Sequence, residues 1–183
     1  MKTSTFVNRT FRSFLFWRKD FLSYLDEPEL YGPLWIAVTY IIFLGLAANL
    51  NNYFIQPENY KFDLQLMVYA VGLTVIFQIA EPLIYSAVIQ CLGGSIPSNE
   101  SIMLTGYSLM IYILPTFLCL VPSLYWHAMM LAIGGFFRSI FLFRNYSARL
   151  DSKLYIFFFV VNIIEALYCF IVLQVMFPKD NGY

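Results

Sequence analysis

Charged side chains are scarce in this chain. Only 12% of its 183 residues are Asp, Glu, Lys or Arg, about half the share in soluble domains, whereas 60% are hydrophobic and 20% aromatic. The 11 basic and 11 acidic residues cancel, so the chain lacks the net positive charge typical of nucleic-acid-binding proteins. So little polar sequence cannot cover a soluble domain, and the composition predicts a membrane protein.

Metal ligands and catalytic residues are also few. The three cysteines (Cys91, Cys119 and Cys169) and the one histidine (His127) are scattered, and no phosphate-binding glycine loop is present. We therefore predict no metal and no cofactor. Ser108 and His127 could form a serine–histidine pair, but the sequence establishes neither a base within reach nor an oxyanion site. We predict that the protein is not an enzyme, and expect His127 at the membrane interface.

Five long apolar stretches fill the chain after Tyr31: 34–50, 66–92, 102–121, 124–143 and 154–177. Each can cross about 30 Å of hydrocarbon as a helix, in which the backbone is hydrogen-bonded internally. We predict an all-α, polytopic membrane protein with a bundle of five transmembrane helices over 31–177 and a short lumenal tail, 178–183. The second stretch is long for one straight span, and Glu81-Pro82 suggests a kink or an extension beyond the membrane.

Residues 1–30 form the predicted cytosolic N-terminal segment. Between Thr5 and Leu25, aromatic and leucine side chains alternate with Arg9, Arg12, Arg18 and Lys19. Basic side chains suit anionic headgroups while aromatic ones enter the acyl boundary, so we predict an amphipathic interfacial helix that contacts the lipid bilayer. A partner-binding helix is the alternative.

The distribution of Lys and Arg predicts the orientation, because short cytoplasmic loops are rich in both. With the N-terminus in the cytosol, only Lys61 and Lys179 fall on the far side. The other basic residues fall on the cytosolic side: Lys2, Arg9, Arg12, Arg18, Lys19, Arg138, Arg144, Arg149 and Lys153. We therefore predict a cytosolic N-terminus and a lumenal C-terminus.

Two pairs of polar residues lie inside predicted spans. Gln78 with Glu81, and Asn162 with Glu165, are each three residues apart and so share a helix face, which should turn into the bundle. They could hold helices together through hydrogen bonds, or line a proton or ion pathway. Arg138 is expected to extend toward the cytosolic surface.

Two segments have an unusual composition. Residues 29–36 read Glu-Leu-Tyr-Gly-Pro-Leu-Trp-Ile, and residues 106–115 begin Gly-Tyr-Ser-Leu and end in Pro115. Proline fixes the backbone, glycine permits close approach, and aromatic rings favour the membrane interface. A rigid turn before the first span, and simple helix packing in the third, would also explain these residues.

The two segments, together with five-span hydropathy from about residue 29 to 177, resemble the YIPF (Yip-domain, Ypt/Rab-interacting) family of Golgi and endoplasmic-reticulum trafficking proteins. Asn49-Leu50-Asn51-Asn52 is similar to the family's ending of the first span. The resemblance implies an adaptor in vesicular transport that binds small Rab-type GTPases and other Yip-type membrane proteins, as a hetero-oligomer. The alternative is a small transporter or lipid-handling protein that uses Glu81 and Glu165. The residues that the resemblance marks as a partner surface are Glu29, Leu30, Tyr31, Gly32, Pro33, Trp35, Gly106, Tyr107 and Pro115.

Overall fold

The computed structural model describes residues 30–147, 150 and 154–177, so the predicted interfacial helix and Glu29 lie outside the described residues. The described part is built from helices. They are α2 (Tyr31–Ile55), α3 (Leu64–Cys91), α4 (Ser98–Ser108), α5 (Met110–Leu118), α6 (Leu124–Ser147) and α7 (Leu154–Met176), with a short 3-10 helix, η2 (Pro57–Asn59), between α2 and α3.

Five helices of 21 to 28 residues are long and apolar enough to cross a membrane, with α4 and α5 counted together as one span from Ser98 to Leu118. The prediction of an all-α bundle of five membrane spans is confirmed. The ends differ from the predicted ones by a few residues, because polar residues such as Asn51 and Asn52 continue a helix beyond its apolar stretch.

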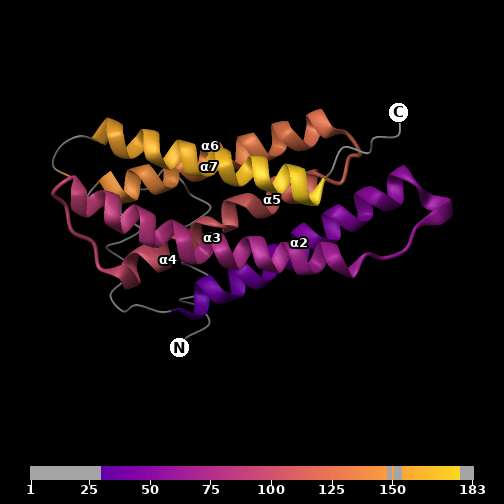
Figure 1. The fold of residues 1–183 in the computed structure, drawn as a ribbon, viewed down its shortest axis with the longest axis horizontal. Coiled ribbons are helices and arrows are strands. Elements are labelled where there is room, and N and C mark those ends of the chain that lie inside the picture. Colours follow the sequence, from indigo (N-terminus) through magenta and orange to yellow (C-terminus); the bar gives the residue numbers. More distant parts are fainter. Residues whose placement is uncertain (1–29, 148–149, 151–153, 178–183) are drawn as a thin grey trace.

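The span made of α4 and α5 lies at the centre of the bundle. In Figure 1, α6 and α7 run side by side along one edge, and α5 lies between them and α2. Helix α4 contacts α2, α3 and α6. The most apolar window of this central span is 67% buried, compared with 22% for α3 and 28% for α7. The outer helices therefore present their remaining apolar faces to lipid.

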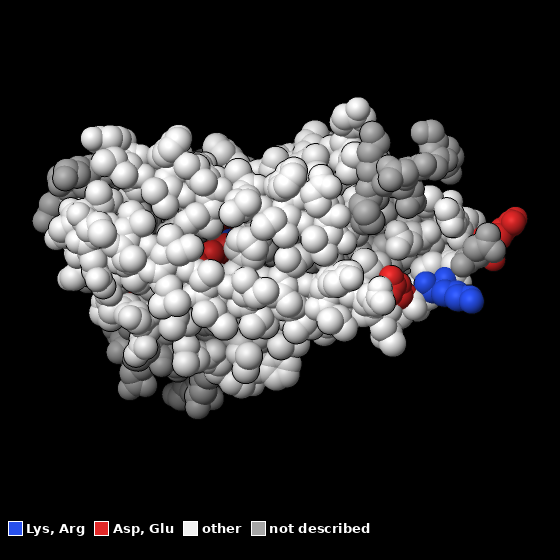
Figure 2. Space-filling model, in the orientation of Figure 1, with Lys and Arg blue, Asp and Glu red and all other residues white. Residues whose placement is uncertain are grey.

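The outer surface is apolar between the two ends of the bundle. Figure 2 shows acidic and basic side chains gathered at the end where the α2–α3 connection lies, and an almost uncharged flank. Within this flank, an acidic side chain is visible at the bottom of a small opening. Among the described residues, the charged side chains visible on this face lie at one end and in the interior.

Helix α3 continues through Pro82. Its 28 residues span about 42 Å at 1.5 Å per residue, longer than the hydrocarbon thickness of about 30 Å. The length favours an extension beyond the membrane or a tilt. The Ser101 hydroxyl of α4 donates to the Pro82 carbonyl at 3.1 Å, which ties the central span to α3 at this point.

Asn49 fastens the connection between α2 and α3. Its side-chain amide donates to the Asp63 carbonyl at 3.1 Å, and its oxygen accepts from the Asp63 amide at 2.7 Å. Asp63 in turn begins α3, because its carboxylate accepts from the Gln65 amide at 2.8 Å. The Asn-Leu-Asn-Asn ending of the first span thus supplies a strap across the loop.

Candidate functional site

A buried ionic cluster, defined here as Glu81, Arg138 and Glu165, joins three helices. The guanidinium of Arg138 on α6 donates to Glu81 Oε1 on α3 at 2.9 Å and to Glu165 Oε1 on α7 at 2.7 Å. Its other terminal nitrogen donates to Glu81 Oε2, so Glu81 is held by a two-pronged contact. All three side chains are buried.

The expectation that Arg138 extends to the cytosolic surface is wrong, since this residue is only 1% exposed. The physical reason is the pair of carboxylates on neighbouring helices, which offsets the cost of removing a guanidinium from water. An arginine on an isolated span has no such partners and reaches for the surface instead.

The cluster extends to the central span. Arg138 Nε donates to the Ser108 hydroxyl at 2.8 Å, and the guanidinium lies 5.6 Å from the centre of the Tyr112 ring. The Tyr112 hydroxyl donates to Glu165 Oε2 at 2.8 Å. The polar groups of α3, α4, α5, α6 and α7 therefore meet at one place.

This place is deep in the bundle. Eleven residues of α7 precede Glu165 (154–164) and eleven follow it (166–176), or about 16 Å of helix on either side. Burial at this depth makes an unpaired charge costly, and the cluster is therefore a strong constraint on how the helices pack.

The central span is broken where the cluster reaches it, a feature that the sequence did not predict. Leu109 separates α4 from α5, and the Ser108 hydroxyl donates to the Thr105 carbonyl at 2.6 Å. Around the break the backbone hydrogen bonds join residues three apart rather than four, from Leu109 N to Gly106 O and from Tyr112 N to Leu109 O. Ser108 is thus engaged as both donor and acceptor at the break.

The two members of each predicted polar pair have different contacts in the fold. Glu81 and Glu165 meet at Arg138, whereas their partners at i−3 do not join the cluster. Gln78 Nε2 is 3.5 Å from the Thr105 carbonyl, and Asn162 Nδ2 donates at 2.7 Å to the Phe158 carbonyl of its own helix. The acids, rather than the pairs, form the polar centre.

Sequence reasoning missed the connection between Arg138 and the two acids. A signal for it was present, because Arg138 stands alone among apolar residues of the fourth span while two other spans each carry one glutamate. Opposite charges buried in different spans predict a contact between them.

The two segments that carry the family resemblance pack against each other. A Cβ added to Gly32 would lie 2.1 Å from the Tyr107 hydroxyl oxygen, and one added to Gly106 would lie 2.4 Å from Pro33 Cβ. Pro115 packs in the same manner against α6, because a Cβ on Gly134 would lie 3.1 Å from Pro115 Cγ. Gly32, Pro33, Gly106, Tyr107 and Pro115 are all buried.

Four other residues of the first segment point outward. Leu30, Tyr31, Leu34 and Trp35 are 57%, 54%, 63% and 49% exposed, and we name these four residues the outer patch. The rings of Tyr31 and Trp35 meet edge to face with centroids 6.0 Å apart. The segment is therefore divided into a packing half and an exposed half.

His127 is buried rather than open at the surface. It is 3% exposed, and its ring lies 4.4 Å from that of Phe177. Ser108 meanwhile accepts from Arg138 and donates to Thr105. In the described contacts, therefore, Ser108 and His127 interact with different residues and not with each other.

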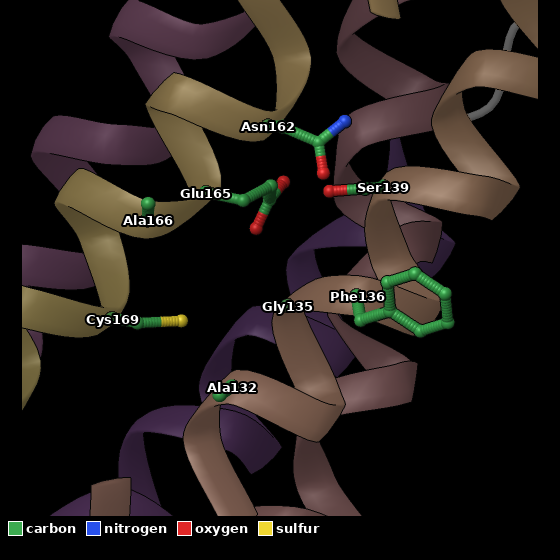
Figure 3. Close-up of a pocket in the computed structure, with 8 residues that line it drawn as sticks. All are labelled: Ala132, Gly135, Phe136, Ser139, Asn162, Glu165, Ala166 and Cys169. Atoms are coloured by element: carbon green, nitrogen blue, oxygen red, sulfur yellow. The ribbon is translucent and has the colours of Figure 1, made fainter. Parts of the chain in front are cut away.

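A pocket of about 300 Å³ lies between α6 and α7. Figure 3 shows Glu165 and Asn162 reaching into it from α7, opposite Ser139 of α6, whereas the ring of Phe136 points away from α7. Its other lining residues are Ala132, Gly135, Ala166 and Cys169. One carboxylate of the ionic cluster thus forms part of a pocket wall.

Comparison with known proteins agrees with the resemblance. The Yip1 domain family matches residues 12–176. The chain is 26% identical over 140 residues to the Protein YIPF1 homolog of Dictyostelium discoideum, an alignment that covers 75% of this chain and 40% of that protein. The chain thus spans less than half the length of this curated relative, and no solved structure gives a significant match. Because the match to the Yip1 domain covers most of the chain and the fold has five membrane spans, the protein belongs to the Yip1 domain family.

Proposed function

We propose that the protein is an integral membrane adaptor in vesicular transport at the Golgi or the endoplasmic reticulum. Residues 31–177 are its membrane domain, and its partners are small Rab-type GTPases and other Yip-type membrane proteins. The Yip1 domain, and the relationship to a protein named as a YIPF1 homologue, support this role.

The observation that carries the proposal is the division of residues 30–36 into buried and exposed side chains. The buried half, with Gly32 and Pro33, fits against Gly106 and Tyr107 and holds the start of α2 in place. The exposed half, the outer patch, consists of large apolar and aromatic side chains. Such side chains, held on a rigid helix, are the usual anchors of a protein interface.

The proposed orientation has the N-terminus in the cytosol and the C-terminus in the lumen. Because Arg138 is paired with acids inside the bundle, its charge does not indicate which end of its span is cytosolic. Without it, eight basic residues fall on the cytosolic side (the nine counted above less Arg138) and two on the lumenal side. In this orientation the outer patch lies at the cytosolic end of α2, where small GTPases are found.

The alternative, transport through Glu81 and Glu165, has less support. Both carboxylates accept hydrogen bonds from Arg138, as expected for groups that hold helices together. An adaptor should keep its function when either acid is replaced by glutamine, since one acid would still balance Arg138. A transporter that uses these acids should lose it.

The test is affinity purification of the full chain from membranes in a mild detergent, with a non-hydrolysable GTP analogue or with GDP. Recovery of a small GTPase that depends on the nucleotide, or of other Yip-type proteins, would support the adaptor. Recovery of the chain alone in both nucleotide states would contradict it.

A further inference from the structure

We propose that the pocket between α6 and α7 binds the ammonium group of a lipophilic amine that enters from the bilayer, with Glu165 as the carboxylate that holds it. This inference goes beyond the adaptor role and does not depend on it. It rests on the charge of the ionic cluster, the oxygen atoms in the pocket and the apolar surroundings of its mouth.

The ionic cluster has one carboxyl group more than its single guanidinium can balance. One guanidinium (+1) faces two carboxylates (−2), which leaves −1 when all three groups are ionised. Both oxygens of Glu81 accept from Arg138, but only one oxygen of Glu165 does, and the other accepts from the neutral Tyr112 hydroxyl. The excess charge is thus least compensated at Glu165, where a single positive charge or a proton would balance it.

The pocket offers oxygen atoms that match an ammonium group. Figure 3 shows the carboxylate of Glu165 and the amide oxygen of Asn162, both from α7, facing the hydroxyl of Ser139 on α6 at one end of the pocket. The Asn162 amide nitrogen donates to the Phe158 carbonyl at 2.7 Å, which orients the amide so that its oxygen points toward Ser139 (Figure 3). An alkylammonium has three N–H donors, one for each of these oxygens.

The size of the pocket favours an organic group over a bare ion. A volume of about 300 Å³ is roughly ten times the 30 Å³ that a water molecule occupies in the liquid. Ala132, Gly135, Phe136 and Ala166 supply an apolar wall against which an alkyl chain can lie. The pocket can therefore hold an amine together with the first part of its chain.

The mouth of the pocket lies on the lipid-facing flank. Phe136 is 56% exposed, and the neighbouring side chains Ile163 and Leu167 on α7 are also exposed. A ligand on this route crosses hydrocarbon, so it travels as the uncharged amine. The proton of a protonated Glu165 then passes to the amine nitrogen, which gives an ammonium and a carboxylate without breaking any other bond.

The experiment uses the full chain in phosphatidylcholine nanodiscs with a long-chain primary amine that carries a photoreactive diazirine. Labelled positions are mapped by mass spectrometry. Dodecylamine and dodecanol are then compared as competitors of the photoreactive amine, since they have the same alkyl chain but only dodecylamine can carry a positive charge. We expect labelling on α6 and α7 around the pocket, and at least ten-fold stronger competition by the amine. Equal competition by the two compounds, or labelling spread evenly over the outer helices, would overturn the proposal.

Three variants sharpen the test. Ala166→Leu fills the pocket without changing charge and should abolish the competed labelling, whereas Phe159→Ala, at an exposed position of α7 outside the pocket lining, should not. Glu165→Gln should weaken competition by the amine at least ten-fold while leaving that by dodecanol unchanged. Undiminished, amine-specific labelling in folded Ala166→Leu would overturn the proposal even if the Glu165 variant failed to fold.

Discussion

Arg138 owes its buried position to the two acids that face it. Moving one guanidinium into hydrocarbon is expensive, and a lone carboxylate is equally unfavourable there. Together the groups make four contacts, three from the terminal nitrogens to carboxylate oxygens and one from Nε to Ser108. The result is a polar centre in a bundle whose other contacts are mostly apolar.

Replacing Arg138 should destabilise the bundle strongly. Arg138→Met leaves Glu81 and Glu165 buried without a cation, and we expect a loss of about 3 to 5 kcal/mol in the free energy of unfolding, measured in mixed detergent micelles. Lys61→Met removes a cation from an exposed loop position and should change stability by less than about 0.5 kcal/mol.

A compensated variant separates this explanation from simple loss of packing. Glu81→Gln and Glu165→Gln, added to Arg138→Met, remove every buried charge of the ionic cluster and should restore most of the lost stability. If the triple variant were as unstable as Arg138→Met, the charges would not be the cause.

The glycines of the packing half give a second prediction at this scale. In Gly106→Ala the new Cβ meets Pro33 Cβ at 2.4 Å and the Pro33 backbone at 3.2 Å, neither of which can turn away. We expect a loss of about 1 to 3 kcal/mol in thermal or detergent-induced unfolding.

Gly72→Ala is the matched control, because a Cβ there meets nothing within 4 Å. Alanine is also the better helix former, by about 1 kcal/mol, so this variant should be as stable as the native protein or more so. Equal stability of the Gly106 and Gly72 variants would contradict the packing described for the two segments.

At the scale of the helices, hydropathy alone predicted five spans because each span must satisfy its own backbone in lipid. The break at Leu109 could not be found in this manner. At the break, Ser108 makes two hydrogen bonds, one to the Thr105 carbonyl and one from Arg138 of α6. Ser108 and Arg138 are 30 positions apart in the sequence, so hydropathy carries no sign of their contact. Likewise, glycine and proline in residues 29–36 and 106–115 indicated close packing, but not that the two segments pack on each other.

The strap at Asn49 is an element whose role can be measured directly. Asn49→Ala leaves the Asp63 amide without its acceptor, and we expect a loss of about 1 to 3 kcal/mol together with faster hydrogen exchange at Asp63 and across the loop from Gln56.

Asn52→Ala serves as its control, since Asn52 is exposed on the same helix and its side chain takes no part in the strap. Exchange in the loop should then match that of the native protein. Unchanged exchange in Asn49→Ala would show that the loop is held by other contacts.

For the whole molecule, orientation decides which end of the bundle a cytosolic partner can reach. We predict that Lys61→Cys, made in a Cys91→Ser background, reacts with a membrane-impermeant maleimide only after sealed microsomes are permeabilised. Native Cys91, which is exposed near the opposite end of α3, should react without permeabilisation. The reverse pattern would invert the topology and move the outer patch to the lumen.

We infer that the outer patch binds the trafficking partner while the buried half of the same segment only positions it. The most direct measurement is the amount of partner captured per folded protein for Tyr31→Ala/Trp35→Ala, compared with Tyr53→Ala/Phe54→Ala at the other end of α2, where both side chains are also exposed. We predict at least a ten-fold loss of capture for the first variant and native capture for the second, with both within about 0.5 kcal/mol of native stability. Native capture by Tyr31→Ala/Trp35→Ala would show that the outer patch does not bind the partner.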